Sequence, residues 1–240
     1  MRGEPSCPKC GGRVRAPGLF ADSWQCDVHG TVHPLQPVIP PSVEALSVVV
    51  HRTQVPVWMP WPLPVGWLFT GVACAGDDRS GGRATAVACT GPGPLGGIGE
   101  LILVAEELGV GLGARYAGID GPDPGPYMNV EKPAQAKLLA AGRPTPLWHV
   151  ATAPDDRAVF AGEALGLWLW AVVWPEQSGL LMYDELVLTD YAGCGGRGGL
   201  GAVWGVVAAL AEAVAPRRAE GSVVGRVRAR CGWSRSSPRP

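Results

Sequence analysis

The 240-residue sequence lacks most of the features that would assign it to a class at once. No run of about 18 apolar residues occurs, so no membrane span is expected. No apolar segment separates Arg2 from Cys7, which predicts that the chain has no secretory signal and is cytoplasmic. The net charge is only −1. Strong electrostatic binding to nucleic acid is therefore not expected.

Lysine is scarce, whereas Gly (35 residues) and Pro (24 residues) are abundant. This composition predicts many loops and few helices. We expect an α+β protein with a small N-terminal zinc ribbon and a β-rich domain that contains one main helix. The expected boundaries are 1–42 for the ribbon and a Pro-rich linker, 43–190 for the domain, and 191–240 for an atypical tail.

Apolar patterns and turn residues predict the elements of the domain. The runs 67–76 and 83–91 flank Asp-Asp-Arg-Ser-Gly-Gly and predict a hairpin, and so do the runs 147–153 and 157–162 around Pro-Asp-Asp-Arg. The other expectations are a strand over 44–57, a helix over 96–109, a strand over 165–175, and a strand or short helix over 180–190.

The tail from residue 191 differs in composition from the rest of the chain. It carries eight arginines and two glutamates, a net charge of +6, whereas residues 1–190 carry −7. Two explanations remain open: a frameshifted, unfolded segment, or a basic tail with one helix in Trp-Gly-Val-Val-Ala-Ala-Leu-Ala-Glu-Ala-Val-Ala.

A cluster of cysteine and histidine near the N-terminus carries the strongest signal. Cys7 and Cys10 are separated by two residues, fifteen residues follow, and Cys26 and His29 are again separated by two. This spacing is typical of a zinc ribbon. Four protein ligands fill a tetrahedral shell, so the Zn²⁺ is expected to be structural.

Glycine follows both ligand pairs, at Gly11 and Gly30, and permits the tight turns that such a site needs. Phe20 is expected to cover the metal. A redox-active Cys7–Cys10 pair is the alternative, but such a pair should follow a strand and open a helix. His33 is an alternative fourth ligand.

A second candidate site is the segment Thr-Gly-Pro-Gly-Pro-Leu-Gly-Gly-Ile-Gly-Glu. Gly91, Gly93 and Gly96 fit a Gly-x-Gly-x-x-Gly loop between a strand and the expected helix, which predicts a nucleotide or phosphate site. Asp120 would meet a ribose hydroxyl. Pro92 and Pro94 argue against it, because they remove amide donors. A proline-stiffened turn is the simpler interpretation.

Other catalytic patterns are missing. His51 and His149 have no recognisable nucleophile beside them in sequence, and no Gly-x-Ser-x-Gly occurs. Glu106 and Glu107 are expected on the solvated face of the helix. Trp58 and Trp61, placed among prolines, are expected to be partly exposed.

The ribbon motifs, with the following segment Val-Pro-Val-Trp-Met-Pro-Trp-Pro-Leu-Pro-Val-Gly-Trp, resemble a family of cytoplasmic actinobacterial proteins of unknown function with an N-terminal zinc ribbon. The resemblance covers residues 1–190 and implies zinc ligation by Cys7, Cys10, Cys26 and His29. It implies no activity.

Two functions follow as hypotheses. The first is a non-catalytic binding or regulatory module with a structural zinc and a protein partner, nucleic acid being a weaker candidate. The second is a small-molecule enzyme, for acyl or phosphoryl transfer, or a nucleotide-binding protein, with Gly91–Gly99 as its anion site.

Overall fold

The computed structural model describes residues 3–19, 21–39 and 41–192, so Phe20 and the basic tail beyond Ala192 lie outside the described residues. The strands are β1 (Val14–Arg15), β2 (Gln25–Cys26), β3 (Gly30–Thr31), β4 (Trp58–Pro60), β5 (Leu68–Asp77), β6 (Gly81–Pro92), β7 (Ile98–Glu106), β8 (Ala136–Ala140), β9 (Arg143–His149), β10 (Ala158–Ala164), β11 (Leu167–Trp174) and β12 (Val187–Asp190). The helices are α1 (Val43–Arg52) and α2 (Leu112–Ala117), with 3₁₀ turns η1 (Gly125–Tyr127) and η2 (Glu176–Tyr183).

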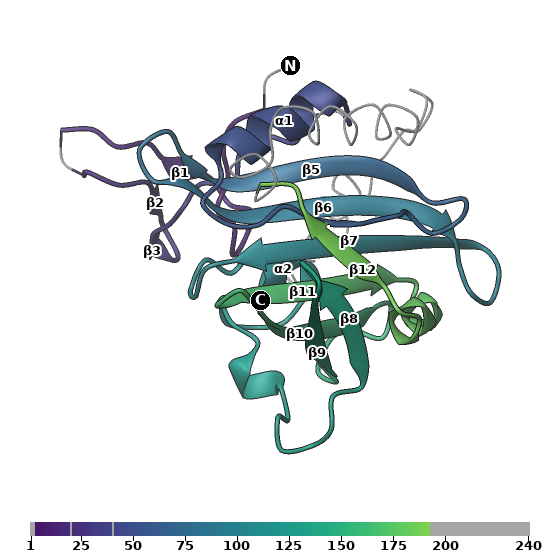
Figure 1. The fold of residues 1–240 in the computed structure, drawn as a ribbon. Helices are drawn as coiled ribbons and strands as arrows, with labels where there is room; N and C mark the ends of the chain where they lie inside the picture. Colours follow the sequence, from purple (N-terminus) through teal and green to yellow (C-terminus); the bar gives the residue numbers. More distant parts are fainter. Residues whose placement is uncertain (1–2, 20, 40, 193–240) are drawn as a thin grey trace, which may run out of the picture.

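The strands form two sheets (Figure 1). Strands β1-β2-β3 make a small sheet at one side of the molecule. The other nine follow the order β4-β12-β8-β9-β10-β11-β7-β6-β5. Both expected hairpins are confirmed: β5 pairs with β6, and β9 pairs with β10 through Trp148 and His149. The protein is therefore β-rich, as expected.

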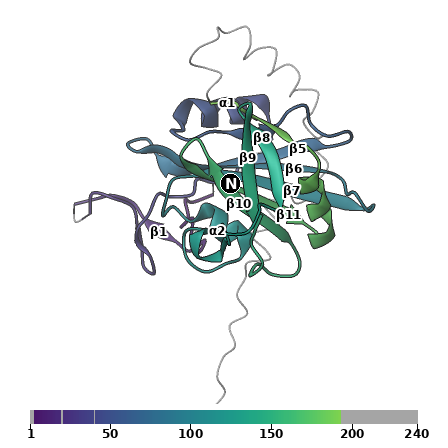
Figure 2. The same cartoon turned by 60° about the horizontal axis from the view of Figure 1, so that its bottom comes forward.

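Two prolines explain why the large sheet curls. Pro144 and Pro146 lie in β9 opposite Leu139 and Lys137 of β8, and they have no N–H to offer β10. Strand β9 therefore pairs with β8 along most of its length, but with β10 only near its end. In the view of Figure 2, β8 and β9 run across the direction of β5, β6 and β7. The larger apolar core, which includes Trp58, Leu101 and Phe160, is buried inside this curl.

The helix expected over 96–109 is wrong, because this segment forms β7. Its side chains alternate between two apolar cores: Leu101 and Leu103 enter the larger one, and Ile102 and Val104 enter a second one beneath α2. A strand buried on both faces is apolar at every position, and this pattern resembles that of a buried helix.

The strand expected over 44–57 is also wrong, because α1 occupies Val43–Arg52 and the next strand, β4, begins only at Trp58. The Ser42 side chain accepts a hydrogen bond from the Ala45 N–H at 3.0 Å and so caps the helix. The buried face of α1 lies over β5 (Figure 1). Trp58, expected to be partly exposed, is 1% exposed, whereas Trp61 is half-buried.

The Pro-rich segment 34–39 is extended, as expected, but it is hydrogen-bonded to the body. The Gln36 N–H donates to the Cys74 carbonyl at 2.9 Å, and the Gly76 N–H donates to the Pro34 carbonyl at 2.9 Å. Pro37 has no N–H to offer on the outer side. The segment thus covers the edge of β5. No described helix has the length and apolar character needed to cross a membrane.

Candidate metal centre

The N-terminal module, residues 3–33, brings two chain turns together. The Gly11 N–H donates to the Cys7 carbonyl, and the Cys7 N–H to the Gly12 carbonyl, each at 2.8 Å. Gly11 has a φ of +72°, a conformation that favours glycine. In the small sheet Val14 pairs with Cys26, so the second turn lies beside the first.

The four predicted ligands meet in space. The Cys10 and Cys26 Sγ atoms are 3.8 Å apart, and the His29 Nδ1 lies 3.6 Å from Cys7 Sγ and 3.7 Å from Cys26 Sγ. All four ligand atoms lie within 4.8 Å of one another. A tetrahedron with metal–sulfur bonds of about 2.3 Å has edges of about 3.8 Å. The spacing therefore fits a tetrahedral metal ion.

The cluster itself is half-buried. Cys7 and Cys26 are buried, whereas Cys10 and His29 are exposed. Burial raises the pKa of the Cys7 thiol to about 12. Burial also opposes ionisation of Cys26, but hydrogen bonds from the Val28 and His29 backbone and from the His29 and Cys7 side chains together outweigh it and lower the pKa of that thiol to about 6. All three cysteines are free, and a disulfide would need sulfur atoms about 2.05 Å apart.

His33, the alternative ligand, lies outside the cluster. Burial first, and then the nearby Arg83 charge, lower the pKa of its imidazole. In the described part of the chain, no other group of three or more His, Cys, Asp or Glu side chains is close enough to hold a metal ion.

The glycines of the predicted anion loop have other roles. Gly91 lies in β6, where a Cβ would come within 2.4 Å of the Trp67 ring. Gly93 and Gly96 form the β6–β7 turn, and their N–H groups donate to the Gly97 and Gly93 carbonyls, each at 3.0 Å. The segment that follows is a strand, so this loop has no helix N-terminus to attract a phosphate.

A different glycine-rich turn binds a buried carboxyl group that the local sequence pattern did not reveal. Between β7 and α2, the Leu112 and Gly113 N–H groups donate to the two oxygens of Glu106 at 2.7 and 3.1 Å. Glu106 is 0% exposed, and this burial raises the pKa of its carboxyl to about 8. The spacing Gly109-x-Gly111-x-Gly113 was the available signal.

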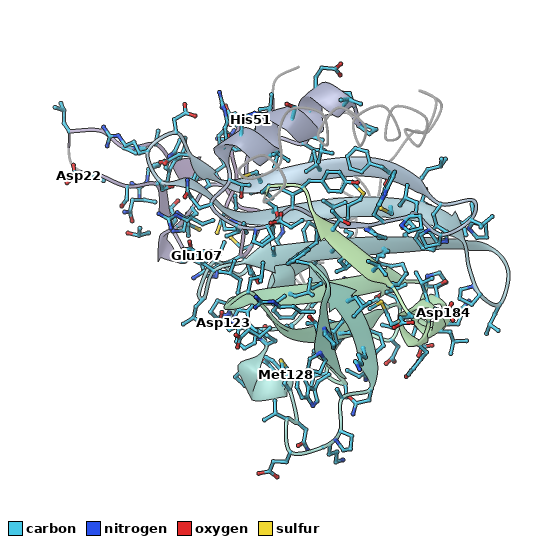
Figure 3. The ribbon with its side chains drawn as sticks, viewed as in Figure 1. Asp22, His51, Glu107, Asp123, Met128 and Asp184 are labelled. Atoms are coloured by element: carbon cyan, nitrogen blue, oxygen red, sulfur yellow. The ribbon has the colours of Figure 1, made fainter. Side chains whose placement is uncertain are left out.

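The expected solvated face at Glu106 and Glu107 is therefore wrong. Glu106 is buried, and Glu107 forms an ion pair with Arg83 at 2.7 Å. Nearby, the Asp123 carboxylate accepts hydrogen bonds from the Gly109 N–H and the Trp168 indole N–H. Figure 3 labels Glu107 and Asp123 on this side of the molecule.

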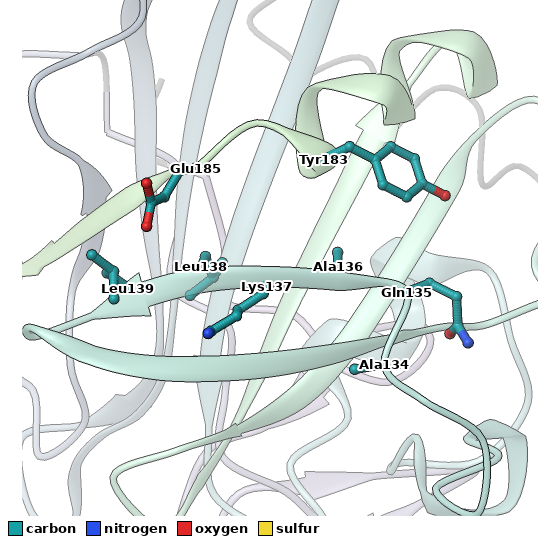
Figure 4. A pocket seen from close by; sticks show the side chains of 8 residues that line it. All are labelled: Ala134, Gln135, Ala136, Lys137, Leu138, Leu139, Tyr183 and Glu185. Carbon is teal, nitrogen blue, oxygen red and sulfur yellow. The ribbon is translucent and has the colours of Figure 1, made fainter.

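One hollow lies where β8 and β12 separate (Figure 4). The two strands pair only through Leu139 and Ala140 on β8 and Val187 and Leu188 on β12, which leaves a space of about 350 Å³ beside Ala136–Leu138. The side chains of Lys137, Tyr183 and Glu185 border it. Lys137 and Glu185 carry opposite charges, so the hollow has no marked preference for one sign.

The fold and the site define a β-rich protein with an N-terminal Cys₃His cluster that can hold a metal ion. A family model described as a family of unknown function, DUF6758, matches residues 1–207, and the chain belongs to this family. The match thus continues past Asp190 into the basic tail. No match was found among curated proteins or among solved structures.

Proposed function

We propose that this protein is a non-catalytic binding or regulatory module with one structural Zn²⁺. Cys7, Cys10, Cys26 and His29 would hold the ion in a zinc ribbon. The observation that supports it most is the closeness of the four ligand atoms: three of the distances between them are 3.6 to 3.8 Å and all lie within 4.8 Å, which suits a tetrahedral shell. A shell of four protein ligands leaves no position for a reacting water.

The small core of the N-terminal module supports this role. Among the described residues of the module, its core has Cys7, Cys26 and Val32 as buried members, with Val14 and Trp24 packed against them. So few apolar side chains cannot hold a module of this size folded, whereas structural zinc contributes on the order of 10 kcal/mol. The metal would therefore keep the module folded on the body, ready to meet a protein partner.

The first test is the zinc content of the full chain, purified without added metal. We expect one zinc per chain, and its loss in Cys26→Ser. Cys74→Ser is the matched control, because Cys74 lies outside the cluster, and it should keep the zinc. Amide exchange should show loss of protection at Val32 in Cys26→Ser, with β7 still protected. A chain without zinc, with Cys7 and Cys10 in a reversible disulfide, would replace this proposal with a redox function.

The enzyme hypothesis predicts a separate result. A protein that binds a nucleotide or coenzyme A at Gly91–Gly99 would be stabilised by about 2.7 kcal/mol at a hundredfold excess over Kd. We expect no such thermal shift, since the Gly93 and Gly96 N–H groups are used within their own turn.

A further inference from the structure

A cleft of about 710 Å³ lies where the N-terminal module meets the body. Its walls are α1 on one side and segment 36–39 on the other, and its floor is formed by Val72–Cys74 of β5. Trp24 of the N-terminal module and the β5–β6 turn also line the cleft. The volume lies within the range of about 300 to 1,000 Å³ that is usual for binding sites.

Apolar side chains line this cleft and remain open to solvent. Val38, Ile39 and Val48 are 37%, 39% and 45% exposed. They come from both walls, so a ligand between the walls would cover all three. Contiguous exposed apolar surface of this kind is a mark of interaction sites.

The β5–β6 turn brings negative charge to the cleft. The Asp77 carboxylate accepts hydrogen bonds from the Ser80 N–H at 2.7 Å and from the Trp24 indole N–H at 3.0 Å. Burial acts against ionisation, but these donors hold the pKa of Asp77 below its ordinary value, so it is charged at neutral pH. Asp78 is paired with Arg52 at 3.3 Å, an exposed pair that contributes little and leaves Asp77 as the net charge.

We propose that this cleft docks a short peptide segment of a partner protein. Apolar side chains of the peptide would pack against Val38, Ile39 and Val48, and a basic side chain would lie beside Asp77. Residues 1–190, which form the cleft, carry −7, and this local charge favours the same basic partner although the tail brings the net charge of the chain to −1. The inference deepens the proposed function, because Trp24 lies two residues before the zinc ligand Cys26 and its position depends on the module being folded.

The test uses the full zinc-loaded chain and two fluorescein-labelled peptides of leucine, valine and serine. One peptide ends in two arginines and the other in two glutamates, and fluorescence anisotropy measures their binding. We expect the arginine peptide to bind at least tenfold more tightly. Val48→Asp should weaken its binding at least tenfold, while Ser47→Asp, on the same helix outside the cleft, should leave it unchanged. Asp78→Lys should reduce or reverse the preference between the peptides.

A second readout is the reaction of Cys74 with N-ethylmaleimide, followed by mass spectrometry. Cys74 lines the cleft and is half-buried, so the arginine peptide should slow its alkylation and the glutamate peptide should not. Equal binding of the two peptides, or no effect of Val48→Asp, would overturn the inference. Binding of neither peptide to the full chain would also overturn it, and this is the result expected if a second copy or the chain's own tail fills the cleft. Slow alkylation of Cys74 without peptide shows neither, because burial raises the pKa of its thiol to about 11.

Zinc content, measured on the same samples, separates the two proposals. One zinc per chain with no peptide binding removes the cleft inference and leaves the structural zinc. No zinc in the chain removes the proposed function itself, whatever the peptides do.

Discussion

Replacing Glu106 by Gln should change how the stability of the protein depends on pH. The native carboxyl has a pKa of about 8, against an ordinary value of 4.5, because it is fully buried. The native state therefore binds more protons than the unfolded state between these values. The contribution of Glu106 to stability is fully present below about pH 4.5, and it is lost as the pH rises through about 8.

The magnitude follows from this difference. One such group lowers the free energy of unfolding by at most about 1.4 kcal/mol for each pH unit. Between pH 5.5 and 7.5 the wild-type chain should lose about 2 to 3 kcal/mol that Glu106→Gln does not lose. The variant should be the less stable of the two at pH 5.5, because its amide N–H₂ faces a backbone N–H donor at Leu112 or Gly113.

Urea unfolding of both chains at the two pH values, in saturating zinc, measures this difference. Zinc is kept saturating because the proposed ligands would bind protons in competition with the metal, and loss of the metal at low pH would destabilise the protein. Glu107→Gln is the matched control, since Glu107 is partly exposed and ion-paired. Equal pH slopes for wild type and Glu106→Gln, within 0.5 kcal/mol per unit, would refute the assignment of Glu106 as a buried carboxyl that is neutral at acid pH.

Two substitutions of glycine test the packing by urea unfolding. Gly113→Ala should destabilise the protein by about 3 kcal/mol, because its Cβ would come within 2.2 Å of the buried Trp170 indole. Gly125→Ala is the control: a Cβ there meets nothing within 4 Å, so the stability should change by no more than about 0.5 kcal/mol. Gly91→Ala should lower the free energy of unfolding by about 1 to 3 kcal/mol, because its Cβ would contact Trp67, and it should leave the response to nucleotides unchanged. A selective loss of nucleotide binding in this variant would instead support the anion site at Gly91–Gly99.

Local sequence patterns predicted the hairpins and the ligand cluster. The β5–β6 hairpin was visible because two β-type runs flank a turn in which Asp77 accepts hydrogen bonds from the Arg79 and Ser80 N–H groups. A signal for α1 was also present: Ser42 as a cap, Glu44 in the first turn, and Arg52 in the last. The run of three valines that follows Ser47 favoured a strand instead. The helix forms because its apolar face is buried against β5, and this burial outweighs the local preference.

Strand β7 shows what periodicity cannot resolve. Leu101 to Ala105 are apolar at every position, a pattern that suits a buried helix as well as a strand with two covered faces. The decision depended on β6 and β11, which pair with both edges of β7. Glu106 was misassigned for the same reason, since a helix would have placed it in solvent.

By itself the sequence determined the Cys7, Cys10, Cys26 and His29 set and its turns, because two residues separate the ligands of each pair and the intervening backbone brings them together. Only the tertiary structure decided that Glu106 is enclosed, that segment 34–39 covers the edge of β5, and that α1, β5 and Trp24 enclose a cleft. These features join residues far apart in the chain, and their positions depend on strand pairing and burial that no local pattern encodes.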